Sequence, residues 1–140
     1  MKKIIAFFLS LLMVCSMAAC APKPDHVVVG RYLPEGVTTN ESVQKKLGLF
    51  LREDGTFYLN CNLSYSYHPS GTYRVKDGVL TLTDNSDIVV AIFNMTDSST
   101  LVYQKKGSAY DATAVGDNEN YSFKIYDGLT FVWDSDPDAE

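Results

Sequence analysis

The chain is poor in the residues that most enzymes use for catalysis. Its 140 residues include two histidines and three cysteines, whereas a hydrolase needs a nucleophile with a base, or an acid–base pair, in convergent geometry. His26 lies near the N-terminus, and His68 precedes Pro69 in a turn sequence. Neither histidine belongs to a catalytic motif. The sequence therefore predicts a protein that is not an enzyme and that uses no cofactor.

Basic charge is also scarce. The chain has 12 Lys and Arg against 17 Asp and Glu, which gives a net charge of −5 at pH 7. Nucleic acids require a basic patch, and electrostatic docking on anionic lipid requires basic clusters. We therefore expect no nucleic-acid partner, and any attachment to a membrane must come from something other than protein charge.

A long apolar run is missing as well, although a short one opens the chain. Lys2 and Lys3 precede an apolar segment from Ile4 to Cys15 that is broken only by Ser10. A spanning helix needs about 20 apolar residues, so this run is too short. A positive start, a short apolar core and a boundary of small residues are typical of a secretory signal peptide.

The boundary of this segment resembles a bacterial lipobox. It reads Met17-Ala18-Ala19-Cys20, with Met17 where leucine is usual. The resemblance implies that residues 1–19 are removed and that Cys20 carries fatty acyl chains such as palmitate. The protein would then be anchored to the extracytoplasmic face of the cell membrane. The alternative is an ordinary secretory cut in "SMA", with Cys20 incidental.

Removal of the signal segment leaves 10 basic and 17 acidic residues, a net charge of −7. It discards Cys15, and acylation consumes Cys20, so Cys61 is the one remaining thiol and no internal disulfide can form. Stability must then come from an apolar core, for which a single domain of this length suffices. Residues 20–26 contain two prolines and are interpreted as the attachment site and a short tether.

Period-two alternation is the strongest signal in the rest of the chain. In "TFYLNCNLS", one face carries Phe57, Leu59, Cys61 and Leu63, and the other carries Tyr58, Asn60 and Asn62. This pattern predicts a half-buried antiparallel strand. Further strand patterns occupy residues 27–33, 47–52, 71–76, 79–83, 87–95, 99–105, 121–125 and 129–133.

Turn sequences separate these strands. Asp-Gly pairs at 54–55, 77–78 and 127–128 supply the positive φ angles of tight hairpins. We expect an all-β domain over residues 27–134, an antiparallel meander of about eight strands that forms a small lipocalin-like barrel, with a β-sandwich as the alternative. Gly30, inside the first strand, should mark a sharp bend or a close approach. Residues 135–140 form an acidic tail.

Three segments carry a family resemblance. They read "VGRYL", "LGLFLREDGTFYL" and "SGTYRVKDGVLTL". They resemble small bacterial lipoproteins with a lipocalin-like β domain, and the extracellular tail module of some metallopeptidases of the β-lactam-sensor type. The resemblance covers residues 29–103 and implies the fold but no activity. The zinc motif of the metallopeptidase is absent from the chain.

Aromatic residues supply the candidate binding surface. Tyr58, Tyr65, Tyr67 and His68 cluster around one predicted hairpin. Tyrosine is enriched in recognition surfaces, although cross-strand packing is the alternative explanation. Cys61 near His68 is not a catalytic pair, because Cys61 falls on the apolar face of its strand. The acidic segment 134–140 lacks the arrangement of a calcium loop, so no metal site is predicted.

Two functions follow from these features. The first is a binding or interaction module at the cell envelope, anchored through lipid on Cys20, with an envelope protein as partner. The alternative is a lipocalin-like carrier of a small apolar ligand. A barrel of about eight strands is either filled by side chains or wide enough for one small ligand.

Overall fold

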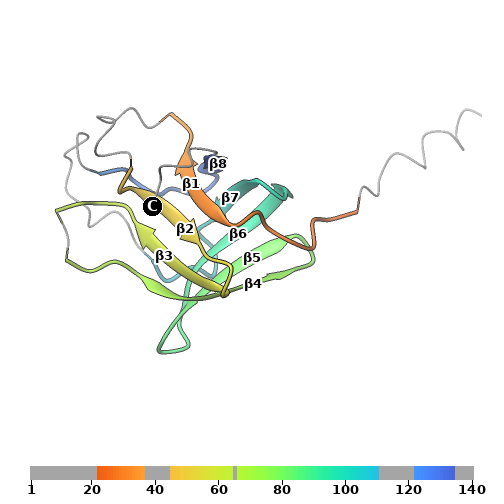
Figure 1. Ribbon diagram of the computed structural model, residues 1–140, viewed down its shortest axis with the longest axis horizontal. Helices are drawn as coiled ribbons and strands as arrows, with labels where there is room; N and C mark the ends of the chain where they lie inside the picture. Colours follow the sequence, from red (N-terminus) through yellow and green to blue (C-terminus); the bar gives the residue numbers. More distant parts are fainter. Residues whose placement is uncertain (1–21, 37–44, 65, 111–121, 135–140) are drawn as a thin grey trace, which may run out of the picture.

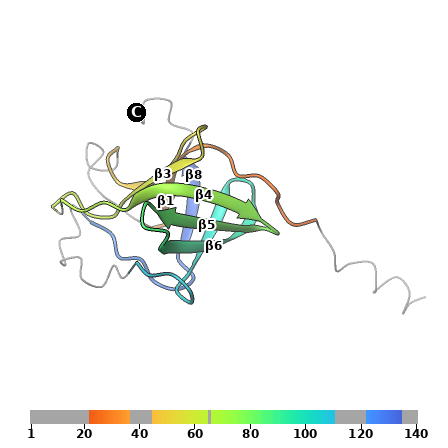
Figure 2. The ribbon, with the colours of Figure 1, turned by 90° about the horizontal axis from the view of Figure 1, so that it is seen from below.

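The computed structural model describes residues 22–36, 45–64, 66–110 and 122–134. This part of the chain forms a closed antiparallel barrel and no helix (Figures 1 and 2). Each strand pairs with the next, and β8 pairs with β1 to close the sheet. The strands are β1 (Gly30–Pro34), β2 (Gly48–Leu51), β3 (Thr56–Asn60), β4 (Ser70–Lys76), β5 (Val79–Asp84), β6 (Val89–Asp97), β7 (Thr100–Gln104) and β8 (Thr130–Asp134).

The barrel that the alternation predicts is therefore confirmed, rather than the sandwich. Closure pairs every strand on both sides, which removes the exposed edges that an open sheet would present. None of the described segments is a helix of the length and apolarity needed to cross a bilayer. The predicted signal segment, Cys20 and the acidic tail at 135–140 lie outside the described residues.

Of the three Asp-Gly pairs, Asp77-Gly78 forms the tight hairpin that the sequence predicts. In the other two pairs only the glycine has a positive φ, and Asp127-Gly128 does not join two strands directly, because residues 122–125 form no strand. Between β4 and β5, Asp77 has φ of 52° and Gly78 has φ of 74°. Two consecutive positive φ angles match the twist of the flanking strands, which is why Asp-Gly is favoured there. Between β2 and β3, the Asp54 carboxylate accepts hydrogen bonds from the amide and the hydroxyl of Thr56, at 2.9 and 2.6 Å.

The first strand begins at Gly30, three residues later than expected. Gly30 has φ of +131°, and a Cβ atom there would lie 2.7 Å from Nε1 of Trp133. Gly30 therefore marks a close approach, but the approaching group is the indole of Trp133 on β8 rather than a backbone.

The third strand is shorter than its alternation suggests. It ends at Asn60, and both Asn60 and Asn62 are buried, whereas Leu63 is half-buried and lines an outer groove. The chain leaves the sheet here because Asn62 forms an isolated bridge with Ser122 and its side-chain oxygen accepts the amide of Ser64 at 2.7 Å. Once the backbone turns, alternation no longer reports which face a residue occupies.

The prediction of a strand at 121–125 is wrong for residues 122–125, which form no strand. Tyr121 lies outside the described residues, and Ser122 forms an isolated bridge to Asn62 rather than part of a strand. Phe123 and Ile125 are nevertheless buried in the core cluster, and the amide of Phe123 donates to the carbonyl oxygen of Cys61 at 2.9 Å. The apolar alternation of this segment therefore reflects packing against the barrel, without strand pairing.

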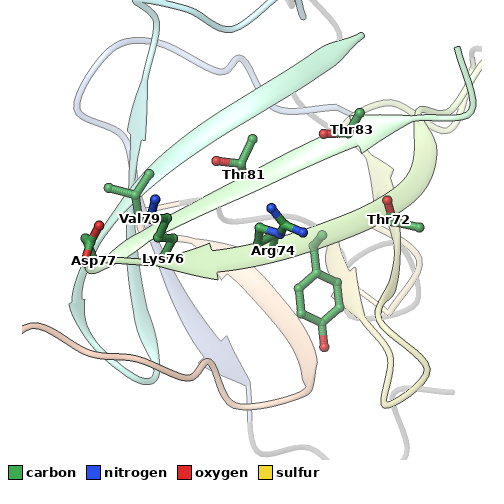
Figure 3. A pocket seen from close by; sticks show the side chains of 8 residues that line it. Thr72, Arg74, Lys76, Asp77, Val79, Thr81 and Thr83 are labelled. Carbon is green, nitrogen blue, oxygen red and sulfur yellow. The ribbon is translucent and has the colours of Figure 1, made fainter. Parts of the chain in front are cut away.

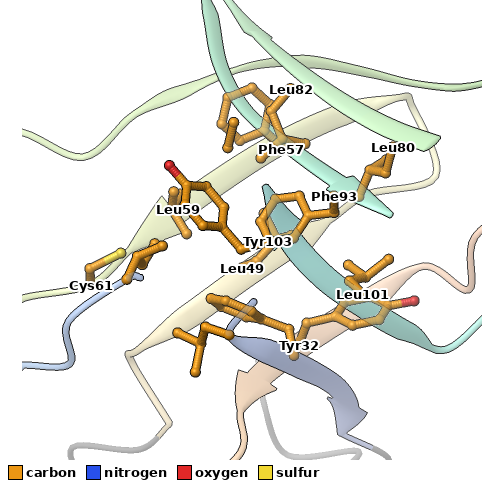
Figure 4. Close-up of a cluster of buried hydrophobic side chains, with 14 of the residues drawn as sticks. Tyr32, Leu49, Phe57, Leu59, Cys61, Leu80, Leu82, Phe93, Leu101 and Tyr103 are labelled. Atoms are coloured by element: carbon orange, nitrogen blue, oxygen red, sulfur yellow. The ribbon is translucent and has the colours of Figure 1, made fainter. Parts of the chain in front are cut away.

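Large side chains fill the inside of the barrel (Figure 4). Phe93 makes edge-to-face contacts with Phe131 and Tyr103, with ring centroids 5.4 and 5.6 Å apart. Such pairs stabilise a core beyond the area that they bury. At most 2% of the surface is exposed for Tyr32, Leu49, Phe57, Leu59, Leu80, Leu82, Phe93, Leu101, Tyr103 and Phe131.

Candidate functional site

A groove of about 730 Å³ lies on the outer surface of the barrel, across β1, β2 and β3. Arg31, Phe50 and Tyr58 are successive partners in the sheet register, and their side chains point away from the core because their neighbours Tyr32, Leu49 and Leu59 point inward. The lining residues are Gly30, Arg31, Lys45, Lys46, Phe50, Leu51, Arg52, Tyr58, Asn60 and Leu63.

The groove is basic although the chain is acidic. Its described lining residues include four cations and no carboxylate. Arg31 is almost fully buried and forms an ion pair with Asp134 of β8, which neutralises one of the four. Lys45, Lys46 and Arg52 are exposed. A concentration of cations on a chain with net charge −5 creates a local positive potential that attracts anions.

Asn60 holds the lysine pair in place. Its side-chain amide donates a hydrogen bond to the carbonyl oxygen of Lys46 at 2.7 Å, and its carbonyl oxygen accepts the amide of Asn62 at 3.2 Å. The turn that carries Lys45 and Lys46 is thereby tied to the end of β3. Both ammonium groups therefore start from a fixed backbone at one end of the groove.

Aromatic rings form a row beside these charges. The centroids of Phe50 and Tyr58 are 5.9 Å apart, and those of Tyr58 and His68 are 5.4 Å apart. Partial burial raises the pKa of the Tyr58 hydroxyl above its ordinary value, so the phenol stays neutral at physiological pH. The row offers an apolar surface on which a planar group can pack, with cations within the same groove.

The structure brings together half of the predicted aromatic surface. Tyr58 and His68 are in ring contact, whereas Tyr67 is 68% exposed and Tyr65 lies outside the described residues. The sequence analysis missed the groove residues Lys45, Lys46, Phe50, Arg52 and Asn60. The available signal was Phe50, an apolar residue on the outward face of a strand that basic residues flank on both sides.

Cys61 is buried among apolar side chains, with 1% of its surface exposed. Burial raises the pKa of its thiol to about 12, and the neighbouring Tyr110 side chain acts in the opposite direction with a smaller effect. His68 packs on Tyr58 on the outer side of the barrel, whereas the thiol of Cys61 lies in the core. The two side chains therefore do not form a pair. Among the described residues, no three His, Cys, Asp or Glu side chains gather to hold a metal.

A second surface hollow, of about 690 Å³, lies over β4 and β5 (Figure 3). Cross-strand neighbours Thr72 and Thr83, and Arg74 and Thr81, line it together with Lys76 and Asp77. The Tyr73 hydroxyl is already bonded to the carbonyl oxygen of Arg52 at 2.8 Å. The residues that line this hollow include no pair of contacting rings, and Asp77 offsets one of its two cations, so the groove over β1–β3 is the better candidate.

Three comparisons with known proteins were made for this chain. Comparison with family models, with curated proteins and with solved structures finds no match. The resemblance to envelope lipoproteins therefore stays a prediction, and function has to be argued from the groove itself.

Proposed function

We propose that the protein is an exported, lipid-anchored binding module of the cell envelope whose binding site is the groove over β1–β3. The observation that carries the proposal is the combination of Lys45, Lys46 and Arg52 with the ring row of Phe50 and Tyr58. Cations supply attraction to an anion, and the adjacent aromatic rings supply area for a planar or apolar group. The ligand is therefore an anionic group that carries an apolar or planar part.

An internal carrier is the weaker alternative. A carrier needs a cavity inside the barrel, and the barrel interior is occupied by large side chains such as Tyr32, Phe93 and Phe131, all 0% exposed. Opening such a site would require these close-packed side chains to move. The packing therefore supports a surface site over an interior one.

The groove is tested with two dyes that share a planar aromatic body. The probe 8-anilinonaphthalene-1-sulfonate carries a sulfonate, whereas N-phenyl-1-naphthylamine is uncharged. We expect the sulfonate to bind more tightly, and the K45E/K46E variant to weaken its binding about tenfold, which corresponds to about 1.4 kcal/mol. Perturbed amide signals in an NMR titration should map to β2 and β3.

The matched control is K105E/K106E, which reverses the same two charges on an exposed turn after β7. It should change sulfonate binding by much less than K45E/K46E. Equal effects of the two variants would refute a local site. Tighter binding of the uncharged dye, insensitive to both variants, would instead support the interior carrier.

The anchor is tested separately. Mass spectrometry of the protein from its native host should show Cys20 as the first residue with acyl chains attached. An unmodified Cys20 would reject the lipid anchor and would leave the groove proposal standing.

A further inference from the structure

The two ends of the barrel differ in their connections. Because consecutive strands are antiparallel, their connections alternate between the ends. Residues 52–55, 77–78 and 98–99 make one end, which we name the short-turn end. The described parts of the other four connections make the opposite end, which we name the long-loop end: residues 35–36, 45–47, 61–64, 66–69, 85–88, 105–110 and 122–129. The chain enters β1 and leaves β8 at the short-turn end (Figures 1 and 2).

The segment before β1 is bound to the short-turn end. The amide of Val28 donates to the carbonyl oxygen of Ser98 at 2.8 Å. The hydroxyl of Tyr32, a fully buried residue, donates to the carbonyl oxygen of Val28 at 2.6 Å, with that of Ser98 3.2 Å away. The indole of Trp133 donates to the carbonyl oxygen of Val29 at 3.2 Å. The three hydrogen bonds to Val28 and Val29 hold the last residues of the segment to β1, β8 and the turn after β6.

Contact continues back to Lys23. A Cβ atom placed on Gly78 would lie 3.0 Å from Cβ of Lys23 and 3.3 Å from its Cδ, so the aliphatic part of Lys23 lies on the turn between β4 and β5. Both ribbon views show the segment passing beside this turn (Figures 1 and 2). Pro22 and Pro24 flank Lys23 and restrict the φ angles of the chain there.

Little chain remains between this contact and the proposed anchor. Two residues, Ala21 and Pro22, lie between Cys20 and Lys23, and the three residue-to-residue steps, at 3.3–3.6 Å per extended residue, span about 10 Å. A lipid on Cys20 therefore keeps the short-turn end within about 10 Å of the anchoring point. A segment held over this length cannot let the barrel turn freely, as a flexible tether would.

We infer that the anchored barrel stands with its short-turn end toward the bilayer and its long-loop end away from it. This inference rests on the lipid anchor of the proposed function. Lys45, Lys46 and Leu63 lie at the long-loop end of the groove, in the connections before β2 and after β3. The lysine end of the groove therefore opens away from the membrane. Arg52 lies at the opposite, short-turn end of the groove. The anion that the lysine pair attracts is therefore a molecule or protein segment of the envelope space, and not a headgroup of the anchoring bilayer.

The orientation is measured with the single tryptophan of the chain. Trp133 lies at the short-turn end and is 37% exposed, whereas Ile88 lies at the long-loop end and is 50% exposed. The acylated protein, and an I88W/W133F variant, are placed in phosphatidylcholine vesicles that contain a nitroxide-headgroup lipid. Quenching of each indole is divided by its quenching with soluble acrylamide, which corrects for exposure.

We expect the corrected quenching of Trp133 to exceed that of the I88W/W133F indole roughly threefold or more, because a strand of five residues adds about 17 Å of distance. Equal quenching, or stronger quenching at position 88, would overturn the orientation. Broadening of NMR amide signals by the same lipid needs no substitution. It should affect residues 77–78 and 98–99 more than 85–87, and it keeps the inference testable should W133F fail to fold.

A flexible insertion tests whether the held segment causes the orientation. About 12 Gly and Ser residues placed between Ala21 and Pro22 leave every described contact intact but lengthen the free chain. The quenching ratio should then fall toward one, and an unchanged ratio would contradict the inference. Chemical coupling of a maleimide lipid to Cys20 of the chain from residue 20 onward allows the same measurement even where the native host leaves Cys20 unmodified. Failure of the anchor and failure of the orientation are thereby distinguished.

Discussion

The thiol of Cys61 lies inside the barrel, where 1% of the surface of the residue is exposed. Burial disfavours the thiolate because the charged form loses its solvation, and this raises the pKa of the thiol from 9.0 to about 12. Only the thiolate attacks electrophiles or binds metals. At neutral pH Cys61 therefore behaves as a small apolar side chain of the core.

This pKa shift predicts a pH dependence of stability. Below about pH 9 the thiol is neutral in both states and contributes nothing to the slope. Between about pH 9 and 12 the unfolded state loses the proton while the folded state keeps it, so the free energy of unfolding falls by up to about 1.4 kcal/mol per pH unit. The effect is measured by urea unfolding of the wild type and of C61A at pH 8, 9.5 and 10.5. The difference between their free energies of unfolding isolates Cys61, because the titration of groups present in both proteins cancels. A constant difference over this range would contradict the prediction.

At the scale of elements, the turns after β2, β5 and β6 are closed by aspartate side-chain oxygens as well as by backbone conformation. In the turn from β5 to β6, the carboxylate of Asp84 accepts the amides of Ser86 and Ile88 at 2.8 and 2.9 Å. Asp87 follows with φ of 62°, a conformation that aspartate tolerates better than most residues. The local sequence therefore specifies the register at which β6 returns along β5.

Loss of this carboxylate should loosen the turn. We expect D84A to lower the free energy of unfolding by about 1–2 kcal/mol, since two amides lose their acceptor. D84N keeps an acceptor oxygen and should cost less than half as much. S86A is the control, because Ser86 contributes only its backbone amide to this turn. Urea denaturation measures all three, and equal costs for D84A and S86A would show that the carboxylate does not stabilise the turn.

At the scale of the whole molecule, closure between β1 and β8 makes the fold cooperative. Phe131 of β8 pairs in register with Pro34 of β1, and its ring contacts Phe93 and Phe123, with centroids 5.4 and 5.9 Å apart. A single side chain at this closure therefore connects the last strand to the middle of the sheet and to the segment at the barrel end.

Truncation of Phe131 should weaken the barrel as a unit. We expect F131A to cost about 3–5 kcal/mol, the range for removing a buried aromatic ring. V132A, one residue further and 37% exposed on the outer face, should cost well under half of that. Trp133 fluorescence and far-UV circular dichroism should report the same unfolding midpoint. Separate midpoints would show that β8 can detach while the remaining strands stay folded.

Most of the sheet could be predicted because its information is local. Alternation in residues 71–76 and 79–83, with Asp77-Gly78 between them, specifies one hairpin without reference to the rest of the chain. Prediction failed at 121–125, where Phe123 and Ile125 show the same apolar alternation but pack against the barrel end. Burial of alternate residues is compatible with either arrangement, so the pattern alone could not separate them.

The groove depends on contacts between residues far apart in the sequence, which a local sequence pattern cannot predict. Arg31, Lys46 and Tyr58 become neighbours only because β1, β2 and β3 pair in one register. The sequence indicated a tyrosine and histidine surface, of which Tyr58 and His68 meet in the fold. The cations could not be assigned to that surface, because net charge says how many charges exist and not where they gather.

The linear order of residues was thus enough to specify most of the strands, the Asp77-Gly78 hairpin, the inward thiol of Cys61 and the all-β meander, since each follows from neighbours along the chain. The tertiary structure decided between a barrel and a sandwich, because closure requires β1 to pair with β8. Closure of the sheet settled the rest. It placed Trp133 over Gly30, bound the segment from Lys23 to Val29 to the short-turn end, and collected three exposed cations beside Phe50 and Tyr58. These features join residues up to about a hundred positions apart, and only the paired register of distant strands brings such residues within contact distance.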